Sequence, residues 1–198
     1  MEALNYLDTF RDFVIVNDIP AAINGKANYL AALGLSNYTE IIGGLYSGDL
    51  SGKNNDLGQN YLKFIKDFFH SDYILVDNNL RNDGLKGLYS VVRCGLSHEY
   101  FIKKISKIEM DSHQALNCSI TYDPHANPQI VFYVNQYFHD FKNAFEKYYK
   151  KLKADTTAST LNDFESALRS INSSLLPVLG SSLDTQTSGG SNLTINPV

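Results

Sequence analysis

An apolar stripe that returns every three or four residues is the feature that most constrains how this chain folds. It is clearest over residues 134–152, where the recurring side chains are Val134, Tyr137, Phe138, Phe141, Phe145, Tyr148, Tyr149 and Leu152. Side chains three and four positions apart share one face of an α-helix, so the stripe predicts an amphipathic helix. The same spacing recurs over residues 2–16, 28–46, 61–69, 85–96 and 160–175. The sequence therefore predicts a mainly α-helical protein.

Local signals interrupt these helices in the first half of the chain. Pro20 predicts a break after the first helix, because proline lacks the N–H that a helical hydrogen bond needs. Residues 47–58 are rich in glycine, serine, asparagine and aspartate and indicate a loop. The polar residues around 77–83 indicate a bend between two helices.

One segment changes the period from 3.6 to 2. Over residues 116–122 apolar and polar side chains alternate, which is typical of a half-buried strand. Residues 123–128 contain two prolines among polar residues and indicate a turn, and residues 130–134 are β-branched or aromatic. We therefore expect an antiparallel β-hairpin, inserted in the helical bundle over about residues 113–134.

The length of 198 residues suits a single domain. A chain of this size buries about 70% of the surface that its unfolded form exposes, so it needs no disulfide or metal to be stable. Beyond Gly180 the residues are mostly serine, threonine, glycine and asparagine, which bury too little apolar surface to order themselves. We expect one domain over residues 1–177 and a flexible polar tail over residues 178–198.

Charge and the ends of the chain bear on partners and location. The formal net charge of -4 counts against a protein that coats nucleic acid without specificity, because such binding depends on neutralising phosphates. The N-terminus lacks the basic and apolar regions of a signal peptide, and no run of 18 apolar residues predicts a membrane span. We expect a cytoplasmic protein without a membrane partner, in which Cys94 and Cys118 are free thiols.

Several kinds of site are not indicated by the sequence. The histidines show neither HxH nor HExxH spacing and the two cysteines are far apart, so we expect no metal site. There is no GxxxxGK[ST] phosphate loop, no dinucleotide fingerprint and no GxSxG nucleophile motif, so we expect no cofactor.

The specific indication of function is the segment 93–98, Arg-Cys-Gly-Leu-Ser-His, at the end of an apolar helical stripe. On an ideal α-helix Arg93 and His98 lie about 140° apart and do not share a face. Two arrangements would bring them together: a helix distorted at Gly95, or a second subunit that contributes its own copy of the pair. A structural interpretation stays open, in which Arg93 binds helix-end carbonyls or a core carboxylate such as Asp67 and His98 caps the helix.

Arg93-x4-His98, on a late helix of a helical bundle, resembles the RxxxxH signature of the HEPN superfamily. Residues 88–100 around it are similar to the motif region of small uncharacterised bacterial HEPN-like proteins. The resemblance implies a homodimer with two motifs facing each other across a cleft, and RNA binding or metal-independent RNA cleavage. His98 would then be the general acid and base, Arg93 would stabilise the phosphorane charge, and the RNA's own 2′-hydroxyl would attack.

Further residues are candidates for supporting roles. Ser97 and Glu99 would assist the site, although both also suit a helix C-terminal cap. Lys103, Lys104 and Lys107 form a basic cluster that would contact the RNA backbone, or would only solvate a helix end. The resemblance also implies a toxin or antiphage setting, with a cognate antitoxin or another protein as a partner.

The alternative is a non-catalytic helical module for dimerisation or protein interaction, whose aromatic surface binds a partner. The two interpretations differ in geometry. An endoribonuclease exposes Arg93 and His98 in a cleft at the dimer axis. An interaction module buries both in satisfied hydrogen bonds and exposes an apolar patch elsewhere.

Overall fold

The computed structural model describes residues 2–51, 57–99, 106–114, 116–155 and 159–170. It is mainly helical with one small sheet, which confirms the fold class predicted from the apolar stripes. The helical elements are α1 (Glu2–Phe10), η1 (Arg11–Asp18), α2 (Ile19–Asn24), α3 (Asn28–Ser47), α4 (Leu57–Phe68), α5 (Asp72–Asn82), η2 (Tyr89–Cys94), α6 (Gly95–Glu99) and α7 (Val134–Ala154). The strands are β1 (Ser106–Glu109), β2 (Ile120–Tyr122) and β3 (Ile130–Tyr133). Residues 159–170 are also helical and are called the 159–170 helix below.

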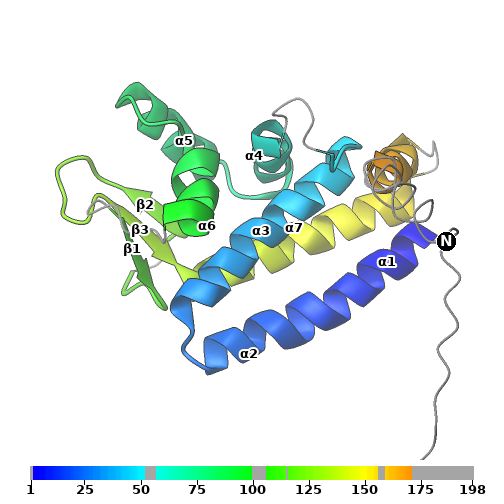
Figure 1. Ribbon diagram of the computed structural model, residues 1–198, viewed down its shortest axis with the longest axis horizontal. Helices are drawn as coiled ribbons and strands as arrows, with labels where there is room; N and C mark the ends of the chain where they lie inside the picture. Colours follow the sequence, from blue (N-terminus) through cyan, green and yellow to red (C-terminus); the bar gives the residue numbers. More distant parts are fainter. Residues whose placement is uncertain (1, 52–56, 100–105, 115, 156–158, 171–198) are drawn as a thin grey trace, which may run out of the picture.

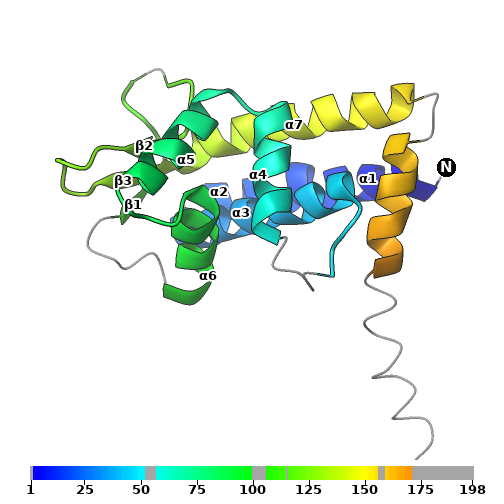
Figure 2. The ribbon, with the colours of Figure 1, turned by 90° about the horizontal axis from the view of Figure 1, so that it is seen from above.

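Three long helical rods run side by side along the molecule (Figure 1). They are α3, α7 and the continuous rod that α1, η1 and α2 form together. Helix α4 crosses this layer and packs on both α3 and α7 (Figure 2). The sheet lies at one end of the long helices and the 159–170 helix at the other.

The break expected at Pro20 is wrong, because the N-terminal rod continues to Asn24. The segment before it, η1, is wound as a π-helix, in which each N–H bonds to the carbonyl five residues earlier. Pro20 then occupies the first turn of α2, where a missing N–H costs least. The bend expected at residues 77–83 is also wrong over most of its length, since α5 runs from Asp72 to Asn82.

The sheet contains the predicted hairpin and one further strand. β2 and β3 pair antiparallel, with Ile120 opposite Phe132. β1 was not predicted; it pairs in parallel with the other edge of β3, so that β3 is the central strand. The side chains of Ile130 and Phe132 are fully buried, and β3 leads directly into α7.

The core is largely aromatic and is centred on α7. Tyr137, Phe141, Phe145 and Tyr148 on its inner face are fully buried. Many of the buried rings meet edge to face at centroid distances of 5.0 to 6.1 Å, an arrangement that suits the aromatic quadrupole. In the described part of the chain, no helix is both long enough and apolar enough to cross a bilayer. The domain boundary expected at residue 177 and the tail over residues 178–198 lie outside the described residues.

Candidate functional site

The backbone of the Arg93–His98 segment changes its winding between the two residues. η2 is a π-helix that ends at Cys94, and the Gly95 N–H bonds to the Ser90 carbonyl, five residues earlier. From Gly95 the chain continues as the α-helix α6. Gly95 itself has right-handed helical angles (φ −59°), so the distortion comes from the π winding and not from a left-handed glycine. π-Helical turns inside helices often occur at functional sites, because they shift the side chains that follow out of the α-helical phase.

Arg93 turns toward the inside of the molecule and pairs with Glu40 of α3. Its Nη2 donates to Glu40 Oε1 at 3.1 Å, and its Nε lies against the second carboxylate oxygen. The side chains are 21% and 11% exposed, respectively, so the pair is largely removed from water. The Arg93 guanidinium also lies 6.0 Å from the centre of the Tyr89 ring. Burial and the neighbouring Glu40 carboxylate raise the pKa of Tyr89 well above its ordinary value, which keeps its hydroxyl protonated.

The carboxylate that Arg93 binds is therefore Glu40. Asp67, the carboxylate considered from the sequence, instead accepts a hydrogen bond from the Tyr46 hydroxyl at 2.8 Å. Glu40 is the single charged residue within the apolar α3 sequence, and this isolated charge is a sequence signal that would have identified it. Sequence reasoning missed it because nothing local connects it to a residue 53 positions away.

His98 points away from this ion pair. Its side chain is exposed on α6, and within the described residues it makes neither a hydrogen bond nor an ion pair. α6 is attached to the bundle nearby, through the Tyr29 hydroxyl, which donates to the Leu96 carbonyl. Arg93 is thus held toward the core, whereas His98 faces solvent. Within one chain the two side chains do not come together.

The supporting candidates are placed only in part. Ser97 is half-buried in α6, and Glu99 ends this helix. Lys103 and Lys104 lie outside the described residues. Lys107 lies in β1 rather than at a helix end and forms an ion pair with Glu109 at 2.5 Å, which raises the pKa of its ammonium group. Its charge is therefore partly neutralised within the strand.

The two cysteines lie in different environments. Cys94 is half-buried in η2, whereas Cys118 is buried and its thiol donates to the Ile120 carbonyl. Burial raises the pKa of the Cys118 thiol to about 12, so it stays protonated and unreactive at neutral pH. Across the described segments, no three histidine, cysteine, aspartate or glutamate side chains gather closely enough to hold a metal ion.

The site was also compared with known proteins through the whole chain. Comparison of the chain with protein-family models, with curated proteins and with solved structures gives no match.

Proposed function

We propose that this chain is a cytoplasmic HEPN-like protein that binds RNA and cleaves it without a metal, through Arg93 and His98 of two facing subunits. The observation that carries the proposal is the different placement of the two side chains within one short helical segment. Arg93 is held in a fixed position by Glu40, and His98 is presented to solvent on the turn that follows.

The exposed imidazole suits the acid–base part of the reaction. Imidazole side chains titrate near neutral pH and can both accept and donate a proton there. At His98, the ring would take the proton from the RNA 2′-hydroxyl, which then attacks the adjacent phosphorus. The proton would return to the 5′-oxygen that leaves.

Arg93 suits the charge-stabilising part. A guanidinium has five N–H donors in a planar fork that matches phosphate oxygens. The Glu40 contacts use Nη2 and Nε, so Nη1 keeps its donors for a phosphate oxygen as far as the described residues show. The ion pair also removes rotational freedom from the arginine before substrate arrives, so less entropy is lost on binding.

The dimer is part of the proposal because the two side chains diverge within one chain. A second copy would bring its own His98 over the first copy's Arg93, or bring both pairs to one cleft. A protein partner such as an antitoxin would then act by covering this face of α6.

The test is cleavage of mixed RNA by the purified full-length protein in EDTA. We expect wild type to cut and His98→Ala to lose roughly 100-fold or more of the rate, the usual contribution of a general acid–base group. Because His98 is exposed, its removal should leave the melting temperature unchanged. His125→Ala, another exposed histidine in the turn between β2 and β3, is the matched control and should cut as wild type does.

Arg93→Lys completes the set, since it keeps a cation beside Glu40 but loses the planar fork. It should cut slowly while staying folded, and the sedimentation of each variant should report a dimer. Wild type that leaves RNA intact while a control nuclease cuts it, or His98→Ala that cuts at the wild-type rate, would remove catalysis from the proposal.

The second candidate is a non-catalytic interaction module, and two observations favour it. The commitment of Arg93 to Glu40 is also what a purely structural arginine would show. In addition, the N-terminal rod and the start of α3 expose large apolar side chains, with Phe13 64%, Val16 58% and Leu30 62% accessible. If catalysis fails, Phe13→Ser with Val16→Ser should change the oligomeric state or partner binding, whereas His98→Ala should not.

A further inference from the structure

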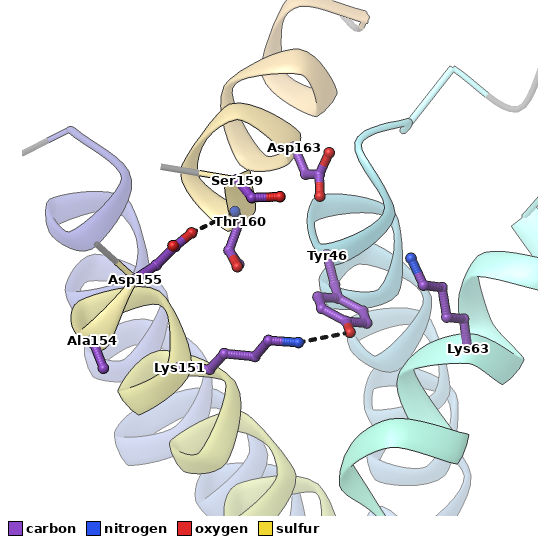
Figure 3. Close-up of a pocket in the computed structure, with 8 residues that line it drawn as sticks. All are labelled: Tyr46, Lys63, Lys151, Ala154, Asp155, Ser159, Thr160 and Asp163. Atoms are coloured by element: carbon purple, nitrogen blue, oxygen red, sulfur yellow. Dashed lines mark hydrogen bonds between the residues drawn. The ribbon is translucent and has the colours of Figure 1, made fainter. Parts of the chain in front are cut away.

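A pocket lined by charged and polar side chains lies at the C-terminal end of α3 (Figure 3). It has a volume of about 580 Å³ and lies between the C-terminal ends of α3 and α7, the helix α4 and the start of the 159–170 helix. Its size falls within the range of roughly 300–1,000 Å³ that is usual for small-molecule sites. The Arg93–His98 segment contributes no side chain to it.

Two lysine ammonium groups meet in this pocket on either side of one tyrosine ring. The Nζ atoms of Lys63 and Lys151 lie 4.7 and 4.8 Å from the centre of the Tyr46 ring, and Figure 3 shows them reaching it from opposite sides. Lys151 also donates to the Tyr46 hydroxyl at 3.0 Å, and this hydroxyl donates to Asp67. The arrangement therefore places two positive charges around one ring.

The nearest acidic contact of these charges is indirect, because the Tyr46 hydroxyl lies between Lys151 and the Asp67 carboxylate. Within the part of the chain that the structure describes, neither Lys63 nor Lys151 has a carboxylate within ion-pair distance. Lys151 uses one of its three donors on Tyr46, and each ammonium has donors left. Two positive charges beside one ring favour an anion that reaches both ammonium groups past the edge of that ring.

The acidic residues of the pocket do not fill that role. Asp155 accepts a hydrogen bond from the Thr160 N–H at 2.6 Å, and so satisfies the start of the 159–170 helix. Asp163 is exposed at the edge of the pocket. The donors for a ligand are therefore the two ammonium groups rather than the helix N-terminus, and Asp163 works against an anion.

We propose that this pocket binds the phosphate group of a small phosphorylated molecule, held by Lys63 and Lys151. Lysine binds phosphate as a point charge from varied directions, which suits two ammonium groups that approach from different helices. A phosphate dianion matches two cations better than a carboxylate does. The volume exceeds that of a free phosphate ion and leaves room for the organic part of a monoester. This site is independent of the Arg93 and His98 chemistry.

The experiment is calorimetric titration of the full-length protein with adenosine 5′-monophosphate and, separately, with inorganic phosphate at constant ionic strength. We expect saturable binding with one site per chain. Tighter binding of the nucleotide would assign the pocket to a phosphate monoester, and equal affinities would assign it to the phosphate group alone. Absence of saturable binding by both probes would overturn the proposal.

Lysine-to-glutamine variants inside and outside the pocket test where the phosphate binds. Lys63→Gln and Lys151→Gln should each weaken binding about tenfold or more, the worth of one charge-assisted hydrogen bond. Lys66→Gln on α4 and Lys153→Gln on α7 remove exposed lysines from the same two helices and should leave the affinity unchanged. Equal affinity in the pocket variants and these controls would overturn the assignment.

Asp163→Asn supplies a test of opposite sign. It removes the negative charge at the edge of the pocket, so phosphate should bind more tightly. Because Asp163 is exposed, this variant should fold normally even if Lys151→Gln, whose side chain packs over Tyr46 and Phe68, does not. Weaker or unchanged binding in Asp163→Asn would contradict the proposed position of the anion.

Discussion

At the scale of single residues, the ion pair between Arg93 and Glu40 decides how the motif is held. It joins η2 to α3 through a carboxylate that is almost fully buried. Charges removed from water are tolerated only while they are paired, so each partner requires the other. The pair fixes the arginine whether or not RNA is its ligand.

A double-mutant cycle measures this dependence. Arg93→Met leaves the Glu40 carboxylate buried without its cation, and we expect it to lower the free energy of unfolding by roughly 3 kcal/mol. Combining it with Glu40→Gln removes the stranded charge and should recover a large part of that loss. Urea unfolding of the three variants gives the coupling, and simple additivity of the two single effects would show that the contact contributes little.

At the scale of elements, the close approach of α3 and α4 depends on one glycine. A Cβ atom at Gly43 would lie 2.6 Å from the backbone carbonyl oxygen of Asn60 in α4, closer than real Cβ contacts come. Gly34, nine residues earlier in the same helix, differs in kind. There the nearest atom is the end of the flexible Ile19 side chain, at 3.1 Å.

The two glycines form a matched pair for alanine substitution. Gly43→Ala should destabilise the protein by about 1–3 kcal/mol, because two backbones must separate. In Gly34→Ala the Ile19 side chain can shift, and the gain in helix propensity of about 1 kcal/mol offsets the crowding. We expect the thermal unfolding midpoint to fall clearly in the first variant and to change little in the second. Equal effects would mean that the helices do not touch at Gly43.

At the scale of the whole molecule, buried tyrosines tie the layers together through their hydroxyl groups. The Tyr137 hydroxyl lies 3.0 Å from Thr39 of α3 and 3.2 Å from the Tyr61 hydroxyl of α4. The Tyr73 hydroxyl of α5 donates to Asp140 of α7 at 2.6 Å. Burial raises the pKa of the phenol at Tyr61, Tyr73, Tyr137 and Tyr148, because a tyrosinate anion is poorly solvated in the core.

These raised pKa values predict a loss of stability at high pH. Below the ordinary phenol pKa of about 10 both states keep their protons, and the free energy of unfolding is unaffected by these groups. Above it the unfolded chain loses protons that the folded chain retains, so stability falls as pH rises. Urea unfolding at a series of pH values up to about 11 should show the decline, and the tyrosinate absorbance of these four buried rings should appear together with unfolding. No tryptophan absorbance overlaps the tyrosinate signal, because the chain has no tryptophan.

Tyr148→Phe is the internal control for this effect. Among the described residues the buried Tyr148 hydroxyl has no hydrogen-bond partner, so its removal should cost little stability near neutral pH. The alkaline decline should become shallower by the share of one tyrosine. An unchanged alkaline profile in this variant would point to another source, such as net negative charge.

The patterns that were interpreted correctly are local in the chain. The apolar period over residues 134–152 predicts α7 because each helical hydrogen bond and each shared face involves residues a few positions apart. The alternation before Tyr122 and the turn that follows predict the β2–β3 pair for the same reason. The segment Arg93–His98 is also local in the sequence, and the function assigned to it stays a prediction.

The remaining features depend on contacts between distant segments, which no local period encodes. β1 is a strand because it pairs with the edge of β3 in parallel register. α5 is a helix although its sequence is largely polar, because Tyr73, Asp77 and Leu80 are buried against the rest of the protein. The fixed orientation of Arg93 comes from Glu40 on α3, and the lysine pocket forms where α3, α4, α7 and the 159–170 helix meet. Local spacing sets which side chains share a face, whereas the partner of a buried charge is chosen by the packing of one element against another.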